Sequence, residues 1–422
     1  MSSRRSQRLG WLCVVGALSA CEPTPPANTG GVELEEIFGP SGESCGRGVV
    51  VVLSDYQSTS VAVLDLEGTT RSGTFVSSGS TQTTLNGPLS GDVVLPSGPL
   101  DDEMVLLDRY PGAILDYLEW ETAEVRGQLD VGTEFASNPQ DYLRLDEDRA
   151  LVSRFAANPD PEASELDRGD DLLVVDPVGL RVLSSVDLSA FRSPGYLARP
   201  STLLRVDDTV IVAFSGHSGD FEDAAEGRLG LFDAETLEAV GDVRIDGWKN
   251  CLGLALSPSG DELAVSCSGL IDGADEPAPP DGGLIRFVIQ RGGAGLTLEE
   301  SQRHPAADWA LGPLGPGLAY ASDGALFFST YGAVEGADAG RADTIQWLDV
   351  ASGEIRTVLE SDPDPFTLGA MACRPGCGVC FFADAGRHVV HRLELDGVDS
   401  PSPVAIEIDE ATGLPPRALG LF

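Results

Sequence analysis

Lysine and histidine are scarce in this sequence. Among its 27 basic residues only Lys249 is a lysine, and the whole chain has four histidines. Its 67 acidic residues leave a formal net charge of -40. A field of that sign repels nucleic acid, so the sequence predicts no nucleic-acid partner.

Long apolar runs are missing as well. The apolar run at residues 9–18 is too short to span a bilayer, and it follows three arginines as in an export signal. It ends in Leu18-Ser-Ala-Cys21, which resembles the lipobox of bacterial lipoproteins. By that resemblance, residues 1–20 are a removable signal peptide, and Cys21 is the lipidated first residue of the mature chain. An ordinary secretory signal is the alternative.

The segment after Cys21 begins rich in Pro, Thr and Gly and has no apolar period. It cannot bury enough surface to order itself, so residues 21–44 are predicted to be a lipid anchor and flexible tether. Residues 45–422 then form the folded domain. We expect an exported monomer, held through its lipid anchor at a membrane of the bacterial cell envelope, the outer membrane.

Helical patterns are almost absent, whereas 50 glycines and 28 prolines indicate many short strands and turns. A unit of two strands joined by a tight turn recurs seven times, at intervals of roughly 45 to 60 residues. These units begin near residues 61, 113, 171, 228, 283, 343 and 388. A second hairpin precedes most of them, which gives four strands in each repeat.

Three of the hairpins that precede the recurring unit align without gaps through their first strand and turn. GLALSPSG at 253–260 matches GLAYASDG at 317–324 and GAMACRPG at 369–376, and an apolar strand follows each. Four-stranded sheets arranged radially form a β-propeller, which protects strand edges by closing the ring. The sequence therefore predicts an all-β fold, a seven-bladed β-propeller of four-stranded blades. A sandwich or a two-domain β protein is the alternative.

The two ends of the chain indicate how the ring closes. The first repeat begins at its second strand, 48–53, and the C-terminal residues 417–422 resemble the start of an inner strand at 250–255. We predict that the C-terminal strand completes blade one. The segment LALSPSGDELAVSC resembles the inner hairpin of YncE-like and quinoprotein-dehydrogenase-like (WD40-like) propellers. That resemblance implies a seven-bladed ring with a central channel and carries over no catalytic residue.

Groupings typical of catalysis are missing. The histidines fall in different repeats apart from His388 and His391, which point to opposite faces of a strand and cannot chelate a metal together. Ser218 lies in a Ser-Gly-His-Ser-Gly stretch that lacks the glycine spacing of a nucleophile elbow. We predict no catalytic residue, no metal and no cofactor.

A ligand is expected at the mouth of the channel, on the loops that enter the inner strands. Trp248, Lys249 and Asn250 occupy that position in blade five, and Trp309 lies on the corresponding segment of blade six. A cation beside an indole in an acidic protein suits an anionic or sugar-like ligand. Packing of the tryptophans between blades is the alternative.

The cysteines are predicted to form disulfides, because an exported chain keeps an even number of them. Across their hairpin turns, Cys251 lies opposite Cys267 and Cys373 lies close to Cys380. Cys45 and Cys377 then remain, and they are predicted to form a disulfide where the ring closes. The alternative pairs Cys373 with Cys377 and Cys45 with Cys380. The spacing C-x3-C-x2-C also occurs around iron–sulfur clusters, but the exported compartment favours disulfides.

Two classes of function remain. The scarcity of histidine and of convergent polar motifs favours a non-enzymatic lipoprotein that presents a propeller for binding a protein or a glycan. The alternative is a hydrolase or lactonase with its site in the channel.

Overall fold

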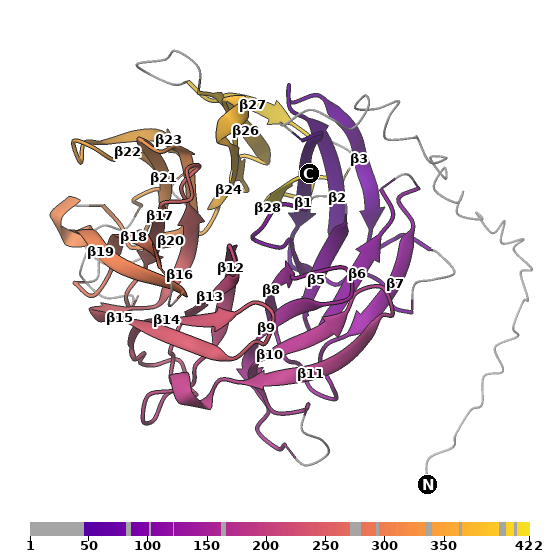
Figure 1. Cartoon of the computed structure of the whole chain (residues 1–422). Helices are drawn as coiled ribbons and strands as arrows, with labels where there is room; N and C mark the ends of the chain where they lie inside the picture. The colour runs from indigo at the N-terminus through magenta and orange to yellow at the C-terminus, as the bar shows by residue number, and fades with distance from the viewer. Residues whose placement is uncertain are drawn as a thin grey trace, which may run out of the picture.

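Seven four-stranded antiparallel sheets are arranged in a ring in the computed structural model of this protein (Figure 1). The structure describes residues 46–81, 86–100, 103–120, 122–161, 166–270, 280–292, 295–309, 311–333, 340–362, 365–395, 402–408 and 412–422. The predicted fold, a seven-bladed β-propeller, is confirmed. The expected signal peptide, the lipidation of Cys21 and the whole tether at residues 21–44 lie outside the described residues.

The blades are numbered along the chain, and each is given from its innermost strand outward. Blade 1 consists of β28 (Pro416–Leu421), β1 (Gly48–Ser54), β2 (Thr59–Asp65) and β3 (Thr70–Ser77), and blade 2 of β4 (Asp92–Val94), β5 (Met104–Tyr110), β6 (Ile114–Leu118) and β7 (Val125–Asp130). Blade 3 consists of β8 (Pro139–Arg144), β9 (Ala150–Ala157), β10 (Gly169–Asp176) and β11 (Arg181–Asp187). Blade 4 consists of β12 (Pro200–Val206), β13 (Thr209–Phe214), β14 (Glu226–Asp233) and β15 (Ala239–Lys249). Blade 5 consists of β16 (Cys251–Leu256), β17 (Glu262–Cys267), β18 (Gly283–Gly292) and β19 (Gly295–Pro305). Blade 6 consists of β20 (Leu314–Ser322), β21 (Ala325–Thr330), β22 (Thr344–Asp349) and β23 (Ile355–Glu360). Blade 7 consists of β24 (Leu368–Arg374), β25 (Val379–Asp384), β26 (Val389–Glu394) and β27 (Val404–Glu407).

The C-terminal strand closes the ring as predicted. β28 pairs antiparallel with β1, with Leu421 opposite Val49 and Leu419 opposite Val51. Blade 1 therefore takes its inner strand from one end of the chain and its other three strands from the other end (Figure 1). β28 thus covers the edge of β1, which would otherwise be unpaired.

The hydrophobic core consists of seven clusters, one at each junction between neighbouring blades. β1 explains how the sequence produces them. Val50 and Val52 face blade 2, whereas Val49 and Val51 face blade 7. Because successive side chains of a strand point to opposite faces, a strand covered on both sides must be apolar at every position. The run Gly48–Ser54 is accordingly buried throughout.

The outer strands alternate differently. The side chains of β11 are exposed or only half-buried along the whole strand, and those of β23 follow the same pattern. In the described part of the chain, no helix is long and apolar enough to cross a membrane.

Candidate functional site

A cavity of about 550 Å³ lies at the centre of the ring. Residues from the inner strands β4, β12, β16, β20, β24 and β28 line it. The lining also includes residues of the loops at the face where the inner strands begin. The channel therefore opens at the face where the sequence analysis expected a ligand.

Glycines draw the inner strands close together around this cavity. A Cβ atom on Gly317 would lie 1.9 Å from the carbonyl oxygen of Gly369, and one on Gly253 would lie 2.6 Å from that of Pro316. Both distances are shorter than any van der Waals contact allows. Gly253, Gly317 and Gly369 are the first residues of the three aligned octapeptides. The repeat keeps glycine at 253 and 317 because the backbone of the next blade occupies the side-chain position.

Three aromatic rings and one arginine form what we call the mouth cluster: Tyr56, Tyr331, Phe366 and Arg417. The Arg417 guanidinium carbon lies 4.9 Å from the centroid of the Tyr56 ring. The rings of Tyr331 and Phe366 are 4.7 Å apart. Arg417 also donates a hydrogen bond from Nη1 to the carbonyl of Phe366 at 3.2 Å. The cluster thus joins blades 1, 6 and 7 across the seam of the ring.

The two outermost rings of the cluster lie on strained backbone. Tyr56 has a φ of 65° and is 62% exposed, and Phe366 has a φ of 63° and is 56% exposed. The left-handed region is unfavourable for bulky side chains, and folding stability gives no reason to hold an exposed ring there. Both rings are exposed to solvent at the rim of the cavity. Such outliers are typical of functional sites.

A buried carboxylate holds the loops that carry Tyr331 and Phe366. Asp343 is fully buried, and its Oδ1 accepts a hydrogen bond from the backbone N–H of Gly332 at 2.6 Å. Its Oδ2 accepts bonds from the N–H groups of Thr367 at 2.7 Å and Leu368 at 3.0 Å. A charged acceptor with three donors is strongly held. Asp343 therefore fixes the residues that directly follow both rings.

The charged residues of the cavity lining are Arg109, Arg417 and Asp92, so the lining has a net charge of +1 in a chain of charge -40. Arg109 donates from Nε and Nη2 to Oδ1 of Asp92, at 3.0 and 2.5 Å, and from Nη1 to Oε1 of Gln140 at 3.3 Å. Arg109 is therefore committed to protein partners. The described residues donate no hydrogen bond to Oδ2 of Asp92.

The predicted ligand residues lie elsewhere in the ring, and the lining of the central cavity includes none of them. Trp248 is buried in the cluster between blades 4 and 5, with the guanidinium of Arg303 over its ring at 4.6 Å. Trp309 stacks between His304 and Phe328, against the cluster between blades 5 and 6. The two tryptophans pack between blades.

Lys249 and Asn250 have protein partners. Nζ of Lys249 lies 2.9 Å from Oδ1 of Asp223 and 3.9 Å from Oδ2 of Asp281. The hydrogen bonds from Lys249 and Tyr196 lower the pKa of Asp223 to about 2, and the bond to Asp223 raises the pKa of Lys249. Asn250, at a φ of 53°, donates to Oγ of Ser268 at 2.6 Å. A role of these residues in ligand binding stays a prediction.

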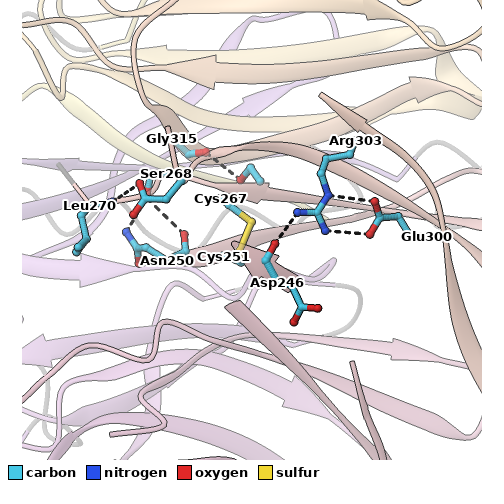
Figure 2. Close-up of a disulfide and its surroundings, with 11 residues drawn as sticks. Asp246, Asn250, Cys251, Cys267, Ser268, Leu270, Glu300, Arg303 and Gly315 are labelled. Atoms are coloured by element: carbon cyan, nitrogen blue, oxygen red, sulfur yellow. Dashed lines mark hydrogen bonds and ion pairs between the residues drawn. A yellow bond between two sulfur atoms is a disulfide. The ribbon is translucent and has the colours of Figure 1, made fainter. Parts of the chain in front are cut away.

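Two disulfides form as the hairpin positions predicted. Cys251 lies opposite Cys267 in the β16–β17 ladder and is bonded to it (Figure 2). Cys373 lies opposite Cys380 in the β24–β25 ladder and is bonded to it. The alternative pairing of Cys373 with Cys377 is therefore wrong. Cys377 is also disulfide-bonded, and the predicted bond to Cys45 falls outside the described residues.

The histidines do not gather. His391 lies in β26 with Nε2 3.2 Å from Oδ2 of the buried Asp384, and His388 precedes that strand with a φ of 58°. Oγ of Ser218 donates to Asp220 at 2.6 Å in an exposed loop and has no histidine hydrogen bond. Among the residues that the structure describes, no three His, Cys, Asp or Glu side chains are grouped so that they could hold a metal ion.

Tyr56, Tyr331 and Phe366 were not predicted from the sequence, and Arg417 was noted only as the start of the closing strand. One local signal was available. Tyr56 follows Ser54 and Asp55 in a polar turn, and Phe366 follows an Asp-Pro-Asp-Pro segment. An aromatic residue in a polar turn between strands does not contribute to a ladder, and it is therefore a candidate for binding.

Comparisons with known proteins agree on the fold. No family model matches the chain, and no curated protein is similar to it. Solved structures do resemble it: a periplasmic gluconolactonase of Pseudomonas aeruginosa is 13% identical with a TM-score of 0.56, over 88% of this chain and 98% of that one. A putative 6-phosphogluconolactonase of Bacteroides fragilis is 11% identical with a TM-score of 0.57, over 91% and 99%. A hypothetical selenium-binding protein of Sulfolobus tokodaii is 10% identical with a TM-score of 0.58, over 90% and 94%. At these identities the likeness defines the class, a β-propeller, and nothing finer.

Proposed function

We propose that this chain is an exported, lipid-anchored binding protein whose propeller takes a glycan at the mouth of its channel. The observation that carries the proposal is the mouth cluster, in which two exposed rings on strained backbone flank a cavity of about 550 Å³. Aromatic rings offer flat apolar surfaces, and the apolar C–H faces of sugar rings stack on such surfaces. The hydroxyl groups of a sugar would meet the backbone groups of the glycine-containing inner strands.

The four large aromatic side chains that are exposed in the described part of the chain support this orientation. Tyr110 ends the second strand of blade 2, Tyr56 and Phe221 follow the second strand of blades 1 and 4, and Phe366 precedes the inner strand of blade 7. In an antiparallel four-stranded blade, both kinds of loop lie at the same face of the ring. The described aliphatic residues that are exposed, such as Val178 and Val404, lie at the other face or on outer strands.

Binding to a panel of oligosaccharides, measured by isothermal titration calorimetry, tests the proposal. We expect one or more glycans to bind to the wild type and to bind at least about tenfold more weakly to Tyr56→Gly and Phe366→Gly, because each substitution removes a stacking surface. Glycine suits the positive φ at both positions, so these variants keep the fold. Val404→Ala, which trims an equally exposed side chain on the outer strand β27, is the matched control. Equal binding by all four proteins would disprove the proposal.

Lipid anchoring is proposed from Cys21 and rests on the sequence alone. Mass spectrometry of the mature N-terminus after expression in a bacterial host tests it. A mature chain that begins at a diacylated Cys21 is expected, and Cys21→Ser should release the protein from membranes. An unmodified N-terminus in the wild type would contradict the anchor and leave the binding site unaffected.

Hydrolysis of a sugar lactone is the second candidate function, and the free Oδ2 of Asp92 favours it. This carboxylate oxygen could take a proton from a water molecule that attacks the lactone carbonyl, while the ring C–O bond breaks and its oxygen becomes the new hydroxyl. Two of the similar folds carry the names gluconolactonase and putative 6-phosphogluconolactonase. Acid release from glucono-1,5-lactone, followed by pH-stat, tests the candidate: turnover that is lost in Asp92→Asn would support it, and a rate equal to the buffer's would dismiss it.

A further inference from the structure

We propose that Arg417 recognises a carboxylate, so that the ligand class of the channel mouth is a glycan whose bound sugar carries a carboxyl group. The inference rests on the proposed function, because it names the charge of the ligand that the mouth cluster would bind. It depends on the contacts of one side chain and on the charge of its surroundings.

Arg417 keeps part of its hydrogen-bonding capacity. A guanidinium group has five N–H donors. Nε of Arg417 donates to the carbonyl of Ser54 at 3.3 Å, and Nη1 donates to the carbonyl of Phe366 at 3.2 Å. No carboxylate of the described residues forms an ion pair with it. Three N–H groups therefore remain for a ligand, among them both hydrogens of Nη2.

The comparison with Arg109 shows that, of the two arginines that line the cavity, Arg417 is the one whose charge no described carboxylate neutralises. Both arginines line the cavity, but Arg109 is neutralised by Asp92 and also bonded to Gln140. The guanidinium carbon of Arg417 instead lies over the Tyr56 ring, 4.9 Å from its centroid, and the two carbonyl bonds hold Nε and Nη1 in place. A planar fork fixed in this way matches the two oxygens of a carboxylate.

The charge of the whole chain selects among anions. Arg417 supplies one positive charge that no described carboxylate neutralises, and the chain as a whole carries -40. A ligand with a single negative charge gains the local pair, whereas a phosphate monoester adds a second negative charge that the protein's field repels. The balance favours a carboxylate over a phosphate.

The experiment uses methyl α-galacturonoside, whose one carboxylate carries a single negative charge, and its methyl ester, in which that carboxylate is replaced by a neutral ester group. Binding is measured by calorimetry to the wild type, Arg417→Gln, Arg417→Lys and Arg356→Gln. Arg356 is the matched control, because its guanidinium lies over the Trp347 ring at 4.0 Å on the outer strand β23, away from the channel. Galacturonate and galactose 6-phosphate are then compared as competitors.

We expect the wild type to bind the acid about tenfold or more tightly than the ester. Arg417→Gln should lower the ratio of acid affinity to ester affinity to about one. Arg417→Lys should give an intermediate ratio, because it keeps the charge and loses the fork. Arg356→Gln should keep the ratio of the wild type. Thermal unfolding of Arg417→Gln at the temperature of the wild type shows that the variant is folded.

Two outcomes would overturn the inference. Equal binding of acid and ester by the wild type would refute the carboxylate and leave the glycan site standing. A preference for galactose 6-phosphate over galacturonate would assign Arg417 to phosphate. If acetate binds through Arg417 as tightly as the sugar acid does, the carboxylate assignment stands but the site is a plain anion site, and the proposed glycan function fails.

Discussion

Arg417 donates a hydrogen bond from Nε to the backbone carbonyl of Ser54, a residue 363 positions earlier in the chain. The strand that closes the ring therefore also carries the cation of the channel mouth. Phe366 and Tyr331 reach the same cluster from the last two blades. Formation of the candidate site thus depends on ring closure, because no blade contains the whole cluster.

The close packing of the inner strands predicts a large effect of one methyl group. Gly317→Ala should lower the free energy of unfolding by about 1–3 kcal/mol, since the new Cβ would meet the Gly369 carbonyl oxygen at 1.9 Å. Gly369→Ala is the control at the equivalent position of the next aligned repeat, because its Cβ would meet only Oγ of Ser329, at 3.8 Å. Denaturant unfolding of both variants measures the difference. Equal stability would refute the packing argument.

The strained backbone at Phe366 predicts that a glycine there lowers glycan affinity without lowering the stability of the fold. Phe366→Gly should be as stable as the wild type or up to about 1 kcal/mol more stable, because glycine removes the penalty of the left-handed backbone. The same variant should lose glycan affinity. Thermal unfolding beside calorimetry measures both properties. A clear loss of stability would mean that the exposed ring serves the fold.

Asp343 should act as a positioning residue for the mouth cluster. In Asp343→Asn, an NH2 group replaces one of the two carboxylate oxygens and cannot accept the backbone N–H bonds which that oxygen accepts. The loss should cost about 2–4 kcal/mol of stability. Glycan affinity should fall while the ratio of acid to ester affinity is kept, because Arg417 is unchanged. Asp349→Asn, in an exposed turn where the carboxylate accepts the N–H of Ser352, is the control. A variant with native affinity would contradict the role.

Asp116 should make the stability depend on pH. Burial is the main cause that raises its pKa to about 7, the carboxylate of Asp108 adds to it, and the hydrogen bond from Gln128 opposes it. Between roughly pH 4 and 7 the folded chain binds more protons at this position than the unfolded chain, so rising pH lowers the free energy of unfolding.

Asp116→Asn removes this dependence. Above about pH 7 the variant should be more stable than the wild type by on the order of 4 kcal/mol, and the gap should close toward about pH 4. Oδ1 of the asparagine can still accept the bond from Gln128. Urea unfolding at several pH values measures the gap, with the exposed Asp208→Asn as control. A gap that is constant over this range would show that Asp116 is charged in the folded protein.

The disulfides predict a simple chemical result. Alkylation of the unfolded, unreduced protein should leave Cys251, Cys267, Cys373, Cys377 and Cys380 unmodified, as peptide mass spectrometry can show. Removing the bridge between Cys251 and Cys267, which spans 16 residues, should cost about 3 kcal/mol in the double alanine variant. Alkylation without reductant at any of the five would contradict the assignment.

Much of the fold could be predicted because it is encoded locally. The facing positions of Cys251 and Cys267 follow from the length of one hairpin. The unbroken apolar run of β1 reflects a strand buried on both faces. The aligned glycines at 253, 317 and 369 mark equivalent positions of successive blades, and at 253 and 317 the structure supplies the steric reason.

The candidate site was not predictable in the same way. Trp248 and Lys249 carried the most suggestive local pattern, yet the ring places the indole between two blades and pairs the amine with Asp223. Tyr56 and Phe366 have no periodicity that would distinguish them from other turn residues. Their neighbours in the mouth cluster, Arg417 and Tyr331, are distant from them in the sequence.

The sequence by itself determined the number of blades, the strand that closes the ring and two of the disulfides, because hairpins, repeats and buried strands are local patterns of spacing and polarity. Only the tertiary structure decided which side chains meet at the channel mouth. Arg417, Tyr56, Tyr331 and Phe366 come together because closing a ring of seven blades brings the last strand beside the first, a relation that no local spacing records.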